Sequence, residues 1–345
     1  MKKFNFFEKI FHKVIYFFNF LKSLLIKIEE FFIKRALIRK ESNNFLFNFI
    51  RDNKNYLPSS NIQITSLMAS RHRKIIDKIG SNRIKPYRWI MINNKIVKVT
   101  KSYNVNYKKC LNLGAGVKNP YALPLLWCFH GALSVDVVEP GKIDEISSIA
   151  GVQELIFHLE FNDDLYFDKH KIKSLNQKGR NIINKKKLLV GENLNTIINK
   201  NIIKTHNKKF ENCIFKQNYF DFIYSRSTLE HVYNIESVLL KLHRSQNVGG
   251  LSFHQIDFTG HNIFDPFWFY YDNREFNNKN LNTLNGWRLS DYVNFYKKLG
   301  VEIKIIDKVL INKDKIKIEK INNEFKKYNL DDLRVQSAGI IVLKQ

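Results

Sequence analysis

Residues 219–261 contain the pattern that most constrains how this chain can fold. The stretch FDFIYS (220–225) is mostly apolar and has the length of a buried strand, and residues 229–246 have the apolar periodicity of an amphipathic helix. The next residues, NVGG, favour a turn, and LSFHQID (251–257) has the pattern of another strand. Strand, helix, turn and strand in this order predict parallel strands of an α/β sheet.

A glycine turn follows an earlier strand. In CLNLGAG (110–116), alternating apolar residues end at two glycines, where the chain can turn sharply and let a ligand approach its backbone. A dinucleotide-binding G-x-G-x-x-G motif would need glycine where Asn119 stands. A P-loop is excluded because no Gly-Lys-Ser/Thr follows. The turn therefore predicts a nucleotide site of another kind.

An acidic residue lies at the tip of the next predicted strand. Glu139 ends LSVDVVE (133–139), and Asp136 precedes it by three residues. A carboxylate in this place can accept hydrogen bonds from both hydroxyls of a ribose. Alternatively, either acid simply lies at a strand end exposed to solvent and binds no ligand. We favour this alternative more for Asp136 than for Glu139.

These segments together resemble the class I S-adenosylmethionine-dependent methyltransferases, in particular bacterial ones that modify sugars and surface polysaccharides. The resemblance rests on LNLGAG, the acid-tipped strand, FDFIYSRSTLEHV, LHRSQNVGGL and HQIDFTGHN, and it covers residues 105–345. It implies an α/β fold with a Rossmann-like seven-stranded sheet, helices on both faces and an antiparallel last strand. It also implies an enzyme whose cofactor, S-adenosyl-L-methionine, lies over the strand ends. In the tail, residues 301–311 and 333–344 have the pattern of the last two strands.

The resemblance also implies which residues hold the cofactor. The glycine turn would approach its amino-acid part, the acid would hold the ribose, and the tip of the fourth strand would lie beside the methionine. These residues are Gly114, Ala115, Gly116, Glu139, Ser225 and Arg226. The sequence departs from the family pattern at Asn112, where an acid is common, and at Lys118, where a small residue is common.

Methyl transfer to a hydroxyl requires alignment of the nucleophile and a general base. We expect the base among Asp257, His261 and His231, which lie on or after predicted strand ends. A histidine with an ordinary pKa near 6.5 is suited to accept the proton. Alternatively, His231 only anchors the start of a helix. His254, Asp257 and His261 could also hold a divalent metal, but our prediction includes no metal.

The predicted function is methylation of a sugar or glycan hydroxyl. The Asp/Asn-Pro-Pro-aromatic tetrad typical of enzymes that methylate amines in nucleic acids is replaced by SRST (225–228), so nucleic acid is a disfavoured partner. The aromatic stretch 264–273 could stack on a sugar or simply pack in the core. The alternatives are a non-catalytic scaffold with this fold and an RNA methyltransferase.

Three regions are expected along the chain. We expect an amphipathic helix at residues 1–40. We expect residues 41–104 to form a helix and a hairpin about Asn93–Asn94, which together make a bridge or cap. Residues 105–345 are expected to form the methyltransferase domain, with a basic insertion near 163–212.

The N-terminal helix and the charge bear on where the protein acts. The helix has a broad apolar stripe opposite lysines, which suits a membrane surface, the protein's own core or a coiled-coil partner. The net charge of +25 fits nucleic acid, an anionic membrane or a lysine-rich composition. Three scattered cysteines suit a reducing cytoplasm. We therefore predict a cytoplasmic protein, peripheral on the inner face of the membrane; the oligomeric state is not predicted.

Overall fold

The computed structural model describes residues 86–100, 105–106, 108–161, 181–184, 187–188, 192–260, 267–271 and 284–345. All of them belong to one compact unit, Asn82–Gln345. The amphipathic helix predicted at 1–40 and the helix predicted within 41–80 lie outside the described residues.

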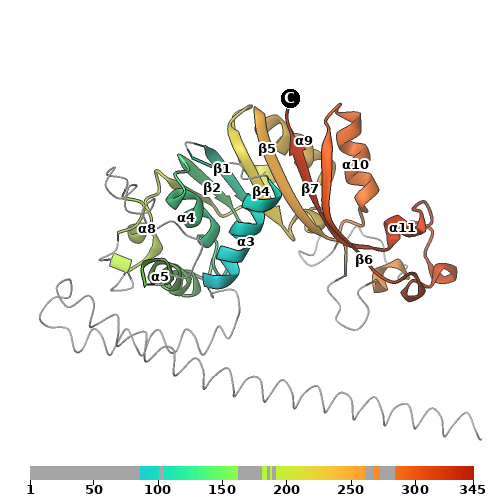
Figure 1. Ribbon diagram of the computed structural model, residues 1–345, viewed down its shortest axis with the longest axis horizontal. Coiled ribbons are helices and arrows are strands. Elements are labelled where there is room, and N and C mark those ends of the chain that lie inside the picture. Colours follow the sequence, from blue (N-terminus) through green and yellow to red (C-terminus); the bar gives the residue numbers. More distant parts are fainter. Residues whose placement is uncertain are drawn as a thin grey trace, which may run out of the picture. The chain divides into compact units, whose positions relative to one another are not determined.

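A seven-stranded sheet forms the centre of this unit (Figure 1). The strand order is β3-β2-β1-β4-β5-β7-β6. Strands β1 to β5 pair in parallel, and β7 runs antiparallel to both of its neighbours. The strands are β1 (Lys109–Leu113), β2 (Ser134–Val138), β3 (Ile203–His206), β4 (Phe220–Arg226), β5 (Gln246–Asp257), β6 (Ile303–Leu310) and β7 (Val335–Leu343). The predicted seven-stranded sheet with an antiparallel last strand is confirmed.

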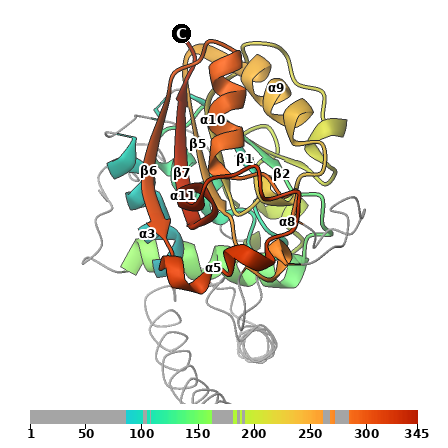
Figure 2. The same ribbon diagram turned by 90° about the vertical axis from the view of Figure 1, so that its right-hand side faces the viewer.

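Helices cover both faces of the sheet, and Figure 2 shows α9 and α10 on one side and α3 on the other. The α-helices are α3 (Pro86–Val99), α4 (Ala122–Phe129), α5 (Glu145–Phe161), α8 (Leu194–Ile197), α9 (Ile235–Ser245), α10 (Leu289–Lys298) and α11 (Leu330–Leu333). Short 3-10 helices are η2 (Phe210–Asn212), η3 (Leu229–His231), η4 (Trp268–Tyr270), η5 (Lys313–Lys315) and η6 (Ile318–Lys320). In the described part of the chain, no helix has the length and apolar character needed to span a bilayer.

Strand β4 shows how the two faces acquire different cores. Successive side chains of a strand point to opposite faces. Phe222 and Tyr224 accordingly pack in the cluster under α3, α4 and α5, whereas Ile223 packs in the cluster under α9 and α10. Because both faces of β4 are buried, its sequence is almost entirely apolar. Ser225, the next residue, points to the same face as Ile223.

The hairpin predicted about Asn93–Asn94 is wrong, because Pro86–Val99 form helix α3. Proline suits the first turn of a helix, where its missing N–H leaves no hydrogen bond unmade. The buried residues Ile90, Asn93 and Ile96 recur every three residues and form one helical face. The Asn93 amide is buried at 2% exposure and contacts the His130 ring at 3.4 Å, so this residue belongs to a packed helix face and not to a turn.

The third strand lies inside the segment predicted to be a basic insertion. β3 pairs with β2 in parallel, from Val135 opposite Ile203 to Val138 opposite His206. It is one of the two edge strands, and only Ile203 of its four residues is buried. A strand this short and this exposed carries no apolar pattern, so its basic composition concealed it.

The aromatic stretch at 264–273 is described at residues 267–271, and there it is core. Phe267, Phe269 and Tyr270 are buried against Phe325 and Leu333 in a third apolar cluster. These three side chains therefore pack in the core and do not stack on a ligand.

Candidate functional site

The glycine turn after β1 is held by the strands on either side of it. Gly114 has a φ of +66° and its N–H donates to Val138 O at 2.8 Å. A Cβ added to Gly114 would lie 2.0 Å from Thr228 Oγ1, so the segment that follows β4 packs directly on the turn. Gly116 has a φ of +83°, and a Cβ there would meet nothing within 4 Å. The turn is thus closed on the Gly114 side and open at Gly116.

Glu139, one residue past the end of β2, ties the turn to the second strand. Its Oε2 accepts the Gly116 N–H at 2.7 Å and its Oε1 accepts the Gly141 N–H at 2.9 Å. A carboxylate has about four lone-pair sites, so each oxygen retains acceptor capacity for a hydroxyl. The acid predicted to hold the ribose therefore lies against the glycine turn.

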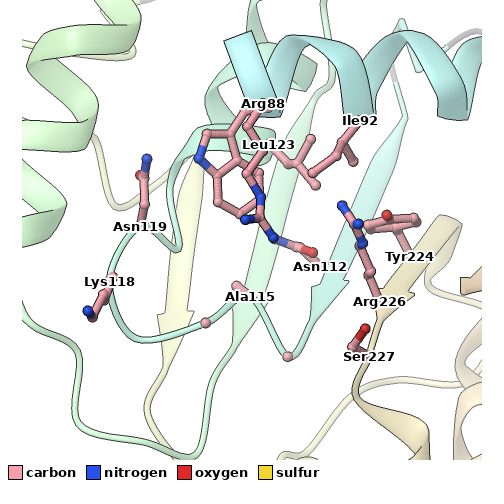
Figure 3. Close-up of a pocket in the computed structure, with 13 residues that line it drawn as sticks. Arg88, Ile92, Asn112, Ala115, Lys118, Asn119, Leu123, Tyr224, Arg226 and Ser227 are labelled. Atoms are coloured by element: carbon pink, nitrogen blue, oxygen red, sulfur yellow. The ribbon is translucent and has the colours of Figure 1, made fainter. Parts of the chain in front are cut away.

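A cavity of about 220 Å³ lies between the glycine turn, α3 and the end of β4 (Figure 3). The turn forms its floor, and the indole of Trp89 and the ring of Tyr224 supply aromatic surface. Asn119 also lines it and is 3% exposed, and neither atom of its amide has a hydrogen-bond partner among the described residues. Its lining residues are Arg88, Trp89, Ile92, Asn112, Gly114, Ala115, Gly116, Lys118, Asn119, Leu123, Tyr224, Arg226 and Ser227.

The two residues predicted at the tip of β4 point in different directions. Arg226 lines the cavity. Ser225 is buried in the opposite face, where its Oγ lies 2.8 Å from His254 Nδ1 of the neighbouring strand. Burial lowers the pKa of His254 to about 4, so its ring is neutral near pH 7. The Ser225 side chain is therefore a structural partner of His254 and does not enter the cavity.

Two of the predicted general bases, Asp257 and His231, do not line the cavity. Asp257 Oδ1 accepts both the N–H and the Oγ1–H of Thr259, at 3.0 and 2.7 Å. His231 is partly buried at the end of η3, and His261 lies outside the described residues. Neither Asp257 nor His231 lines the cavity, so their catalytic role stays a prediction.

The alternative metal site is not formed by the residues that the structure describes. His254 and Asp257 are three apart on β5, so their side chains point to opposite faces of the sheet. Across the described part of the chain, no group of three or more His, Cys, Asp or Glu side chains could hold a metal ion.

Asp136 is held by another residue of the sheet. Its Oδ1 lies 2.6 Å from His206 Nε2 on β3, and the carboxylate is almost fully buried. The acid belongs to the packing between β2 and β3, and Glu139 is the acid next to the glycine turn.

Reasoning from the sequence missed the contribution of α3. Arg88 and Trp89 line the cavity, but they belong to a segment interpreted as a hairpin. Pro86, followed by Ile90, Asn93 and Ile96 at a spacing of three residues, is the sequence pattern that could have indicated this helix. Asn112 and Lys118, noted only as departures from the family pattern, also line the cavity.

The site has features suited to the cofactor that the resemblance implies. Gly116 opens onto free space, so a ligand can lie against its backbone. The buried Asn119 amide, which has no hydrogen-bond partner among the described residues, lines the same cavity and offers a donor and an acceptor. The glycine turn and Glu139 would hold S-adenosylmethionine, which supplies an electrophilic methyl group when bound.

A match to a protein-family model agrees with this assignment. Residues 179–253 match the family model of a methyltransferase domain, which spans β3, β4, α9 and the first part of β5. No curated protein matches the chain. Among solved structures, the YcgJ protein of Bacillus subtilis is 12% identical with a TM-score of 0.39, over 73% of this chain and 99% of that one.

A second solved structure is phosphoethanolamine N-methyltransferase 2 of Haemonchus contortus in complex with S-adenosyl-L-methionine. It is 14% identical with a TM-score of 0.42, over 79% of this chain and 60% of that one. Likeness at this level says nothing about the substrate of this chain. From the matched family model, the strand order and the geometry of the glycine turn, we conclude that the chain carries a class I S-adenosylmethionine-dependent methyltransferase domain.

Proposed function

We propose that this methyltransferase transfers the methyl group to a hydroxyl of a sugar or glycan at a membrane surface. The observation that carries the proposal is the cavity over the glycine turn, where aromatic and amide side chains lie together. The rings of Trp89 and Tyr224 offer faces on which a sugar can pack. The amides of Asn112 and Asn119 can each donate to and accept from a hydroxyl.

The proposed chemistry requires a base beside the acceptor hydroxyl. The candidates remain Asp257, His261 and His231, near the carboxyl end of β5 and after β4. Burial raises the pKa of the neighbouring Glu230 to about 8, so that carboxyl is protonated near pH 7. Glu230 then adds no negative charge next to Asp257.

A membrane surface is proposed because of residues 1–40. Their sequence combines an apolar stripe with lysines on the other side. Such a helix would bring the enzyme to lipid-linked glycans on the cytoplasmic face. Polysaccharide modification is the process to which this activity would belong.

Calorimetric titration with S-adenosylmethionine tests the cofactor half of the proposal. We expect micromolar binding by the full chain, no binding of NAD, and binding at least about tenfold weaker in Glu139→Ala, which loses charge-assisted acceptors. Because Glu139 also holds Gly116 and Gly141, thermal unfolding must show that the variant is folded. Glu192→Ala, which changes an exposed acid, is the matched control and should bind as the wild type does.

Methyl transfer to a panel of mono- and oligosaccharides tests the acceptor. Transfer to a hydroxyl, lost in His261→Ala or Asp257→Asn with cofactor affinity retained, would support the proposal. Cofactor binding with no transfer to any sugar would contradict it. Absence of cofactor binding in the wild type would instead favour the scaffold alternative.

A further inference from the structure

The loop after β2, residues 139–141, carries the acid that lies against the glycine turn. Backbone N–H groups engage both carboxylate oxygens of Glu139: Oε2 accepts from Gly116 at 2.7 Å and Oε1 accepts from Gly141 at 2.9 Å. One of these donors belongs to the loop itself, so the position of Gly141 helps to set the orientation of the carboxylate. A group that fixes the loop therefore also fixes the acid predicted to hold the ribose.

One side chain just past the end of β3 holds this loop. Asn207 donates from its Nδ2 to Glu139 O at 2.8 Å and to Gly141 O at 2.5 Å. An amide nitrogen carries two N–H donors, so a single side chain can serve both carbonyls. The strand adds a third bond, from the Glu139 N–H to His206 O at 3.1 Å. The loop is thus tied to β3 by two side-chain bonds and one backbone bond.

On its other side the loop packs closely on the glycine turn. A Cβ added to Gly141 would lie 2.5 Å from Val117 Cγ1 and 3.1 Å from Glu139 Oε1. Farther along the chain, the Asp144 N–H donates to Val117 O at 2.8 Å. Without the Asn207 amide, the loop would keep its contacts with the turn and lose its two side-chain bonds to the third strand.

We propose that Asn207 is a positioning residue for the cofactor: by holding residues 139–141, it keeps the Glu139 carboxylate in the orientation that receives the ribose hydroxyls of S-adenosylmethionine. Two backbone donors in fixed places leave the remaining lone pairs of the carboxylate in fixed places, and hydrogen bonds weaken steeply when misaligned. Asn207 acts through Glu139, because the loop carbonyls take its donors. The proposal rests on the assignment of the ribose to Glu139 and does not depend on the acceptor.

Binding of S-adenosylhomocysteine and of its 2′,3′-dideoxy analogue to the full chain tests this role without turnover. A hydrogen bond to a charged group changes affinity about tenfold or more, so the wild type should prefer the ligand with ribose hydroxyls at least about tenfold. Asn207→Ala should weaken binding of S-adenosylhomocysteine about three- to tenfold and binding of the analogue less than about twofold. A purely structural role would weaken the binding of both ligands equally.

Three further variants identify the cause. Asn207→Asp has nearly the same size but no N–H donor, so its preference for the ribose hydroxyls should fall as in Asn207→Ala. Glu139→Ala should abolish the preference, and adding Asn207→Ala to it should have little further effect, because the two residues act in one chain of contacts. Asn201→Ala changes another exposed asparagine near β3 and is the matched control, which should keep both affinities.

Thermal unfolding of each variant shows whether it is folded. An undiminished preference in Asn207→Ala or Asn207→Asp, or an equal loss of affinity for both ligands, overturns the proposal. So does an undiminished preference in Glu139→Ala, because the ribose would then be held elsewhere, and so does a wild type without any preference. Failure of the sugar acceptor would leave all these ratios unchanged, so it is distinguishable from failure of the present proposal.

Discussion

Two buried ionisable residues, Arg288 and Glu230, show how single side chains shape the region around β5 and β7. Arg288 is 1% exposed, and its guanidinium donates to the backbone carbonyls of Phe258, Asp332, Leu333 and Val335. It also lies over the rings of Phe258 and Tyr270. One side chain thus satisfies the carbonyls at the end of β5 and at the start of β7.

Arg288→Met should destabilise the protein strongly. Methionine has a similar length but no donors, so four carbonyls lose their partner, and we expect a loss of about 2–4 kcal/mol in the free energy of unfolding. Arg244→Met, at an exposed position near the end of α9, is the control and should cost less than about 0.5 kcal/mol. Urea unfolding measures both. Equal midpoints for the two variants would contradict the role of Arg288.

Glu230→Gln should change how stability depends on pH. Burial raises the pKa of Glu230 from 4.5 to about 8, and its Oε1 accepts the Asp257 N–H at 3.4 Å. Between these pKa values the folded state holds a proton that the unfolded state has lost. Stability therefore falls as pH rises, by up to about 1.4 kcal/mol per pH unit. Glutamine is neutral throughout and removes this loss.

Unfolding midpoints measured from about pH 5.5 to 8.5 check the effect. The wild type should lose stability toward the alkaline end and Glu230→Gln should lose less. His254 acts with the opposite sign at lower pH: burial lowers its pKa from 6.5 to about 4, so stability falls as pH drops through that range. Glu230→Gln should leave this acid-side loss in place. Identical alkaline slopes in the two proteins would exclude Glu230 as the cause.

At the scale of elements, the glycine turn and α3 determine the site together. The turn needs glycine because both residues have positive φ, and Glu139 holds it through Gly116. Helix α3 adds Arg88 and Trp89 above the turn. α3 and β1 follow each other in the chain, and packing of α3 on the sheet through Ile90 and Ile96 brings the helix to the turn.

Gly114→Ala and Gly116→Ala should separate folding from cofactor binding. Both place a side chain at positive φ, which costs about 1–2 kcal/mol. Only Gly114→Ala also drives a methyl group into Thr228, so it should be the less stable variant. Gly116→Ala projects its methyl group into open space over the turn, so it should stay folded and bind S-adenosylmethionine at least about tenfold more weakly.

Thermal unfolding and calorimetric titration of both variants measure the two effects. The Thr228→Ala change should restore part of the stability of Gly114→Ala, because it removes the side-chain atoms that the new methyl group meets. Normal cofactor affinity in Gly116→Ala would mean that the ligand does not approach this part of the backbone.

The described residues belong to one compact unit, Asn82–Gln345, which holds the sheet and the site. The net charge of the chain is +25, and basic residues occur along most of its length. A positive surface attracts both nucleic acids and anionic lipids. The amphipathic pattern at 1–40 favours the lipid interpretation.

Liposome flotation of the full chain against a chain lacking residues 1–40 tests this interpretation. With anionic vesicles the full chain should float and the shortened chain should remain in solution, because burial of apolar side chains and attraction of lysines both reside in that segment. Neutral vesicles should recruit less of the full chain. If both proteins stay in solution with anionic vesicles, membrane binding through this helix is excluded.

The sequence by itself indicated the buried strands and the helices that follow them through their apolar patterns, and its resemblance to class I methyltransferases implied the seven-stranded sheet. It also placed Glu139 beside the glycine turn, since a glycine pair and an acid at successive strand ends meet at one edge of a parallel sheet. Only the tertiary structure decided the rest. β3 carries no pattern because it is a short exposed edge strand. Ser225 turns away from the cavity with His254, and α3 brings Arg88 to it, because these positions depend on contacts between segments far apart in the chain.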